Sequence, residues 1–127
     1  MVKPVFAFVG RLSEEKGIER TLKIFSDIEK KHNFTYLIVG DGPQRKYLEN
    51  LVGILELKDN VRFVGNQKNP YKFLNLADCY ICSSFGEGLS TSCIEASILN
   101  KHIISTEVSG AREIVENPSI GDRKSVV

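Results

Sequence analysis

Short apolar runs alternate with amphipathic segments along this chain, and this alternation constrains the fold more than any other feature. The apolar runs are rich in β-branched and aromatic residues, as strands are, and they are predicted at residues 5–9, 34–39, 61–64, 78–82 and 102–105. The segments between them carry apolar residues at helical spacing, and helices are predicted at residues 17–31, 44–57, 70–76, 91–99 and 111–116.

Strands that alternate with helices imply parallel pairing and right-handed crossovers. The strands are apolar on both faces, as expected when helices cover both sides of a sheet. With 127 residues the chain fits a single domain with one core. The predicted fold is therefore a Rossmann-like three-layer α/β/α sandwich with a parallel sheet of about five strands.

Two predicted helices have apolar faces that can be read from the sequence. The face of the first consists of Ile18, Leu22, Phe25 and Ile28, and that of the second of Tyr47, Leu48, Leu51 and Leu55. A turn, Gly40-Asp41-Gly42-Pro43, precedes the second helix, and proline suits the first position of a helix.

Charge and composition exclude several classes of function. The net charge is +1, which argues against a nucleic-acid partner. No apolar run approaches the roughly 20 residues of a membrane-spanning helix. The three cysteines form an odd set and no secretion signal is seen at the start, so reduced thiols and a cytoplasmic location are expected. A peripheral position at the inner face of the membrane is compatible with this for a full-length protein.

Cys79 and Cys82 form a C-x-x-C pair with two interpretations. One is a redox or metal pair; the other is two small apolar residues in a buried strand, where free cysteine is common. A thioredoxin-type pair opens a helix, whereas this pair lies inside an apolar run. A zinc site needs further ligands, and His32 and His102 are not spaced to supply them. The strand interpretation is favoured.

Ligands of open parallel sheets bind beyond the carboxyl ends of the strands. Four loops are predicted to lie at that rim: loop 1 (residues 10–17), loop 2 (40–43), loop 3 (65–69) and loop 4 (83–90). The rim is therefore where candidate ligand-binding residues are sought.

Loop 4 has the most specific pattern, because it sets Glu87 and Glu95 eight positions apart across a glycine-rich turn and a helix start. A strand, a glycine-rich loop and a helix start commonly hold an anion on backbone N–H groups. Carboxylates in the same segment suggest that hydroxyl groups are also bound, which points to a nucleotide or a nucleotide-sugar. Ser92 and Glu95 also match a capping box, S-x-x-E, so Glu95 has a purely structural alternative that local sequence leaves open.

Loop 1 carries two cations, Arg11 and Lys16. Arginine offers a planar fork for phosphate oxygens and lysine a mobile point charge. The alternative is a solvated surface in which both cations pair with the neighbouring glutamates 14, 15 and 19. The loop lacks the G-x-G-x-x-G of dinucleotide-binding proteins and the G-x-x-x-x-G-K-[ST] of P-loops.

Several short motifs together carry a resemblance to a known family. They are Gly10-Arg11-Leu12, Glu15-Lys16-Gly17, Val39-Gly40-Asp41-Gly42-Pro43, Val61-Arg62-Phe63-Val64-Gly65, Glu87-Gly88 with Glu95-Ala96, and Gly110-Ala111-Arg112-Glu113-Ile114-Val115. In this order they resemble the C-terminal, nucleotide-sugar-binding domain of retaining GT-B glycosyltransferases of the family 4 type (glycosyl transferases group 1). The resemblance covers residues 5 to about 117.

The resemblance implies a role for each residue of the donor site. Arg11 and Lys16 would hold the donor diphosphate, Glu87 hydroxyls of the transferred sugar, and Glu95 the ribose. Arg11, Lys16 and Glu87 are the candidate catalytic residues. The remaining candidates are Gly10 in loop 1, Asn66 and Gln67 against the base, and Gly88, Leu89, Ser90 and Thr91 at the helix start. Fixed cations and N–H groups aimed at a departing diphosphate stabilise the transition state, so neither a metal nor another cofactor is expected.

The implied substrate is a UDP-, GDP- or ADP-sugar, and the implied acceptor is a saccharide or a lipid-linked molecule. The acceptor would be bound by an N-terminal domain that this chain lacks. Residues 1–127 would thus form a single donor-binding domain, truncated at its C-terminal end and inactive alone, with residues 118–127 unassigned. Two other classes compete: a non-catalytic nucleotide-binding or interaction module, and a flavodoxin-like receiver or flavin protein. A receiver needs an acidic cluster after its first strand, where this chain has Arg11.

Overall fold

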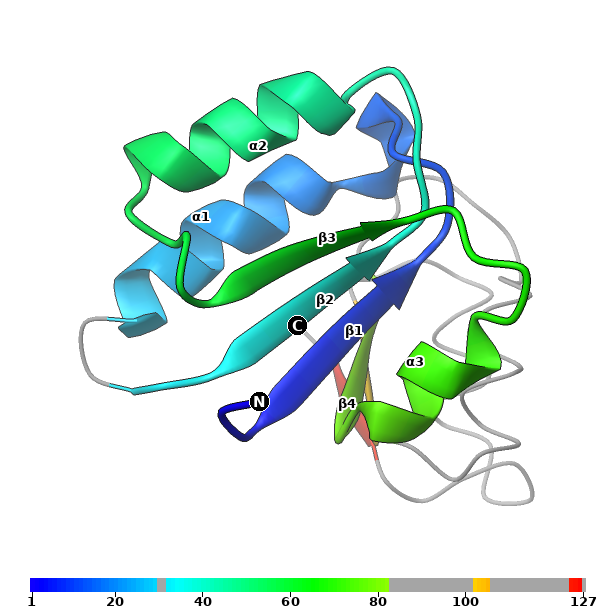
Figure 1. Ribbon diagram of the computed structural model, residues 1–127. Coiled ribbons are helices and arrows are strands. Elements are labelled where there is room, and N and C mark those ends of the chain that lie inside the picture. Colours follow the sequence, from blue (N-terminus) through cyan, green and yellow to red (C-terminus); the bar gives the residue numbers. More distant parts are fainter. Residues whose placement is uncertain (30–31, 83–101, 106–123, 127) are drawn as a thin grey trace.

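The computed structural model describes residues 1–29, 32–82, 102–105 and 124–126 (Figure 1). The two helices predicted at residues 91–99 and 111–116 lie outside these residues.

Within the described residues, six parallel strands form one sheet in the order β3-β2-β1-β4-β5-β6. They are β1 (Val5–Val9), β2 (Thr35–Val39), β3 (Val61–Gly65), β4 (Cys79–Cys82), β5 (His102–Ser105) and β6 (Lys124–Val126). The first five confirm the predicted strands to within a residue at either end. The sixth strand, β6, lies within residues 118–127, for which no element was predicted. Its three residues carry only one strand-like apolar side chain, so the pattern there was too short to recognise.

Four helical segments are described: a 3-10 helix (Glu14–Lys16), α1 (Ile18–Glu29), α2 (Arg45–Ile54) and α3 (Tyr71–Leu76). Two boundaries differ from the sequence prediction for backbone reasons. Gly17 has φ 68 and separates the 3-10 helix from α1, so α1 begins one residue later than expected. Glu56 has φ 58, which ends the helical path of α2 before the predicted Leu57.

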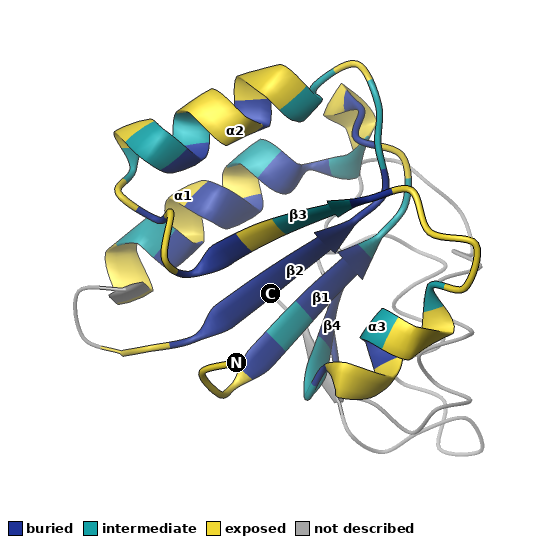
Figure 2. Ribbon diagram, viewed as in Figure 1, coloured by how far each residue is buried: buried dark blue, intermediate teal, exposed yellow. Residues whose placement is uncertain are grey.

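The helices lie on both faces of the sheet (Figure 1). α1 and α2 lie next to one another on one face, and α3 lies on the other, against β1. Tyr36 and Ile38 of β2 point into the larger core under α1 and α2, whereas Leu37 belongs to the smaller cluster with Ala77 and Phe73. This alternation explains why all of β2 is buried (Figure 2).

The helix faces were predicted correctly except at two positions. Ile18, Leu22 and Phe25 of α1 are buried, but Ile28 in its last turn is 39% exposed. On α2 the buried face is Leu48 with Val52, flanked by Leu51 and Leu55. Tyr47 is 50% exposed, because it lies a third of a turn away from that face.

Four aromatic rings fill the centre of the larger core. Phe25 of α1 stacks on Phe34 with ring centroids 4.7 Å apart, and its ring also meets Phe6 and Tyr36 at 5.1 and 5.0 Å. Such offset and tilted contacts are the favourable geometries for aromatic pairs. This cluster packs α1 against β1 and β2.

Two smaller expectations also have an outcome. Cys79 and Cys82 are the first and last residues of strand β4, as the strand interpretation predicts. Cys79 is a free thiol, and burial raises its pKa. Among the described helices, none combines the length and the apolar character that crossing a bilayer requires.

Candidate functional site

Three of the four predicted rim loops are described, and they lie together at the carboxyl ends of β1, β2 and β3 (Figure 1). Loop 4, with Glu87, Gly88, Leu89, Ser90, Thr91 and Glu95, lies outside the described residues. The site can therefore be built from its loop 1, loop 2 and loop 3 side.

Backbone hydrogen bonds connect the three loops directly. Gly10 N–H donates to Val39 at 3.0 Å, and Gly40 N–H donates to Gly65 at 2.9 Å. Leu12 forms two further bonds with loop 2 and the residue that follows it: Leu12 N–H donates to the carbonyl of Asp41 at 3.0 Å, and Gln44 N–H donates to the carbonyl of Leu12 at 2.9 Å. These bonds join main-chain atoms only, so this part of the rim does not use the side chains of Arg11, Lys16 or Asn66.

Gly40 is the residue that lets loops 1 and 2 approach so closely. It has φ 140, and a Cβ added there would lie 1.8 Å from the carbonyl oxygen of Gly10. No side chain fits that space, and an L-residue rarely adopts that φ. The glycine of this turn is therefore required by the contact between the two loops.

Loop 1 holds its two cations on a short folded segment. Leu12 is fully buried and anchors the loop, and the 3-10 helix that follows places Lys16 one residue before α1. Arg11 is exposed and Lys16 is half-buried. The pKa of Glu15 is lowered, chiefly by its own backbone N–H and further by the charges of Lys16 and Arg11. Both cations therefore lie close enough to Glu15 for their charges to act on its carboxylate.

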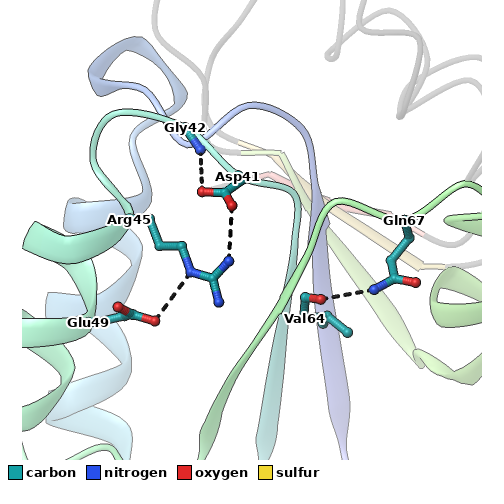
Figure 3. Close-up of polar contacts among 6 residues, drawn as sticks. All are labelled: Asp41, Gly42, Arg45, Glu49, Val64 and Gln67. Carbon is teal, nitrogen blue, oxygen red and sulfur yellow. Dashed lines mark hydrogen bonds and ion pairs between the residues drawn. The ribbon is translucent and has the colours of Figure 1, made fainter.

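Loop 3 carries the two residues predicted to lie against a base. Asn66 and Gln67 are both exposed at the rim. Gln67 Nε2 donates to the carbonyl of Val64 at 2.9 Å, so its amide nitrogen closes the loop (Figure 3). Asn66 donates no side-chain hydrogen bond to the described residues, and it is the freer of the two for contact with a ligand.

Sequence reasoning missed a charged cluster beside loop 2, formed by Asp41, Arg45 and Glu49. Arg45 Nη1 lies 3.0 Å from Asp41 Oδ2, and its Nε lies 3.3 Å from Glu49 Oε2 (Figure 3). Asp41 Oδ1 also accepts a hydrogen bond from Gly42 N–H at 2.8 Å, which together with Arg45 lowers the pKa of Asp41. The signal was available, because the three residues follow one another at i, i+4 spacing.

The fold and the rim define a Rossmann-like α/β domain in which two cations, Arg11 and Lys16, follow the first strand. Residues 2–121 match the model of the family described as Glycosyl transferases group 1. The chain belongs to this family, as its motifs predicted.

Two relatives and one solved structure show the range of proteins to which the chain is similar. It is 42% identical to an uncharacterized glycosyltransferase of Methanocaldococcus jannaschii, over 87% of this chain and 28% of the relative. It is 36% identical to the lipopolysaccharide core biosynthesis glycosyltransferase LpsD of Rhizobium meliloti, over 91% of this chain and 34% of the relative. HepE of Anabaena, solved in complex with UDP-glucose, superposes with a TM-score of 0.77 at 26% identity, over 90% of this chain and 32% of that one. The chain thus spans about a third of the length of these proteins.

Proposed function

We propose that the chain is the donor-binding domain of a retaining glycosyltransferase and that its rim holds a nucleotide-sugar. The observation that carries this proposal is the pair of cations in loop 1, presented on a backbone frame at the carboxyl end of β1. Membership of the family adds support, as does the solved structure of HepE with UDP-glucose.

The chemistry of the rim suits a nucleoside diphosphate. As the sugar leaves, negative charge grows on the diphosphate, and fixed cations aimed at that charge stabilise the transition state more than the ground state. Arg11 and Lys16 are proposed to take this role without a metal ion. The exposed face of loop 3, at Asn66, is proposed to meet the base.

Loop 4 is proposed to complete the donor site. Glu87 would accept hydrogen bonds from hydroxyls of the transferred sugar, and Glu95 would accept those of the ribose. The N–H groups of Gly88, Leu89 and Ser90, with Thr91, would add donors at the start of the following helix. The acceptor, a saccharide or a lipid-linked molecule, would be bound by a domain other than this one, so that this domain alone is expected to be inactive.

Calorimetric titration of the purified domain with UDP, GDP and ADP, each with and without magnesium, tests the proposal. Binding of at least one of them, with the same affinity in both buffers, is the expected result. Absence of heat with all three on folded protein would refute the donor site and leave a non-catalytic module that kept the fold.

A further inference from the structure

The guanidinium of Arg45 lies at the junction of loops 2 and 3. Arg45 begins α2, and its side chain reaches back to Asp41 while Glu49, one turn ahead, holds its Nε (Figure 3). The side chain of Arg45 is only 34% exposed, less than either carboxylate partner. Two carboxylates thus fix the orientation of one planar group, as arginine's fork geometry favours.

That planar group also covers a backbone turn. Gly65, the last residue of β3, is buried and has φ 77, and a Cβ added to it would lie 3.4 Å from Arg45 Nη1. The carbonyl of the same glycine accepts the hydrogen bond from Gly40 N–H. Gly65 is therefore bonded to loop 2 through its carbonyl, and the guanidinium of Arg45 lies beside its Cα.

The turn at Gly65 decides the direction in which loop 3 leaves the sheet. The register between β2 and β3 shifts here: Ile38 is opposite Phe63, but Val39 is opposite Gly65, so Val64 has no partner in β2. The Val64 carbonyl is instead capped by Gln67. Loop 3 accordingly starts at an irregularity of the sheet, where a side-chain bond from Gln67 takes the place of a bond to β2.

We propose that Arg45 is a positioning residue for the nucleoside half of the donor site. Clamped by Asp41 and Glu49, it fixes the turn at Gly65 and hence the placement of Asn66 and Gln67. The effect of Arg45 on ligand binding rests on the proposed function. Its effect on the position of loop 3 does not. Arg45 is not expected to touch the diphosphate, which is assigned to loop 1.

An ordinary surface ion pair would behave differently. Exposed i, i+4 pairs contribute little to stability and nothing to the choice of ligand. The chain offers a matched example in α1, where Lys23 Nζ lies 3.0 Å from Glu19 Oε2. Arg45→Met and Lys23→Met each remove one cation from one such arrangement, so a difference between them isolates what is particular to Arg45.

The experiment compares both variants and Arg45→Lys with the wild-type domain by calorimetry. The probes are UDP, GDP and ADP, which contain a nucleoside, and inorganic pyrophosphate, which does not. We expect Arg45→Met to lower the affinity for the nucleoside diphosphate about 3- to 10-fold and to leave the affinity for pyrophosphate unchanged. Arg45→Lys, which keeps the charge without the planar fork, should recover part of the loss. Lys23→Met should match the wild type with every probe.

Backbone amide NMR spectra without ligand provide the second measurement. Arg45→Met should shift the amide signals of residues 65–69, whereas Lys23→Met should leave them in place. Unchanged loop 3 signals, or equal losses for UDP and pyrophosphate, would overturn the positioning role. If the wild-type domain binds none of the probes, the proposed function fails, and the loop 3 signals alone decide whether Arg45 positions the loop.

Discussion

The carbonyl of Gly10 occupies the space that a side chain at Gly40 would need, so that the turns after β1 and β2 touch backbone to backbone. Gly10 immediately precedes Arg11 in loop 1, the loop to which we assign the donor diphosphate. The contact makes the geometry of loop 1 depend on a residue about 30 positions away that offers no functional group.

Gly40→Ala is expected to destabilise the domain by about 2–4 kcal/mol, because the added methyl group meets the Gly10 carbonyl and the backbone is strained at φ 140. Urea unfolding measures the loss. Gly53→Ala is the control: this glycine lies inside α2 and an added Cβ would meet only the end of the Lys58 side chain, at 3.4 Å. That variant should gain about 0.5–1 kcal/mol. Equal midpoints for Gly40→Ala and the wild type would contradict the contact.

Arg11→Ala and Lys16→Ala are expected to lower the affinity for nucleoside diphosphates much more than the affinity for the corresponding nucleosides. A charge-assisted hydrogen bond to phosphate contributes about 1.5–3 kcal/mol, and a nucleoside has no phosphate to lose. Parallel titrations with UDP and uridine measure the difference. Lys58→Ala, an exposed cation on the segment after α2, controls for the change in net charge. If both ligands lose affinity equally, the two cations support the loop and do not bind phosphate.

Substitutions in loop 4 separate the two glutamates. If Glu95 binds ribose, Glu95→Gln should lower the affinity for UDP and for UDP-sugars alike. Glu87→Gln should weaken only the sugar conjugate, and in the full-length enzyme it should lower turnover, because misplacement by about 1 Å can cost ~100-fold. The capping-box alternative predicts for Glu95→Gln a stability loss of about 0.5–2 kcal/mol with normal affinity. Thermal melts recorded beside the titrations distinguish the two.

The stability contributed by Asp41 should depend on pH. Hydrogen bonding to Gly42 N–H, and then to Arg45, lowers the pKa of Asp41 in the folded domain below its value of 3.8 in the unfolded chain. A lowered pKa means that the ionised carboxylate stabilises the fold above pH 3.8 and that this contribution disappears as the pH falls through the folded pKa. Asp41→Asn should therefore melt lower than the wild type at pH 7, and the difference should shrink as the pH falls below 3.8 and through the folded pKa of Asp41. A constant difference across that range would show that Asp41 acts through shape alone.

Two buried tyrosines should respond oppositely to removal of the hydroxyl group. The Tyr36 hydroxyl is buried and bonds to no partner among the described residues, and burial raises its pKa. Tyr36→Phe should therefore stabilise the domain by about 1 kcal/mol. The Tyr80 hydroxyl donates to the Val9 carbonyl at 3.4 Å, so Tyr80→Phe should destabilise it. A loss of stability in Tyr36→Phe would reveal a partner for its hydroxyl, such as a buried water.

Most of the fold could be predicted from the sequence because most strands and helices are long enough for their apolar pattern to be recognised. The strand of three residues at 124–126 and the helix boundary at Glu56 depend on tertiary pairing and on one backbone angle, which periodicity does not report. Arg11 and Lys16 could be proposed from residue type and from their place after the first strand. The role of Arg45 could not, because it arises from proximity to Gly65, twenty residues further along the chain and at the end of a different strand. The predictions for Asn66, Gln67 and loop 4 remain predictions.

The backbone connection between loops 1, 2 and 3 has a consequence for redesign. Gly10, Gly40 and Gly65 join the turns through main-chain hydrogen bonds, and these bonds do not involve the side chains at positions 11 and 66. The side chains at positions 11 and 66 can then be varied without loss of the main-chain bonds that join the turns. A library that varies those positions and spares the three glycines should yield mostly folded variants with altered ligand preference. A library that varies the glycines should yield mostly unfolded protein.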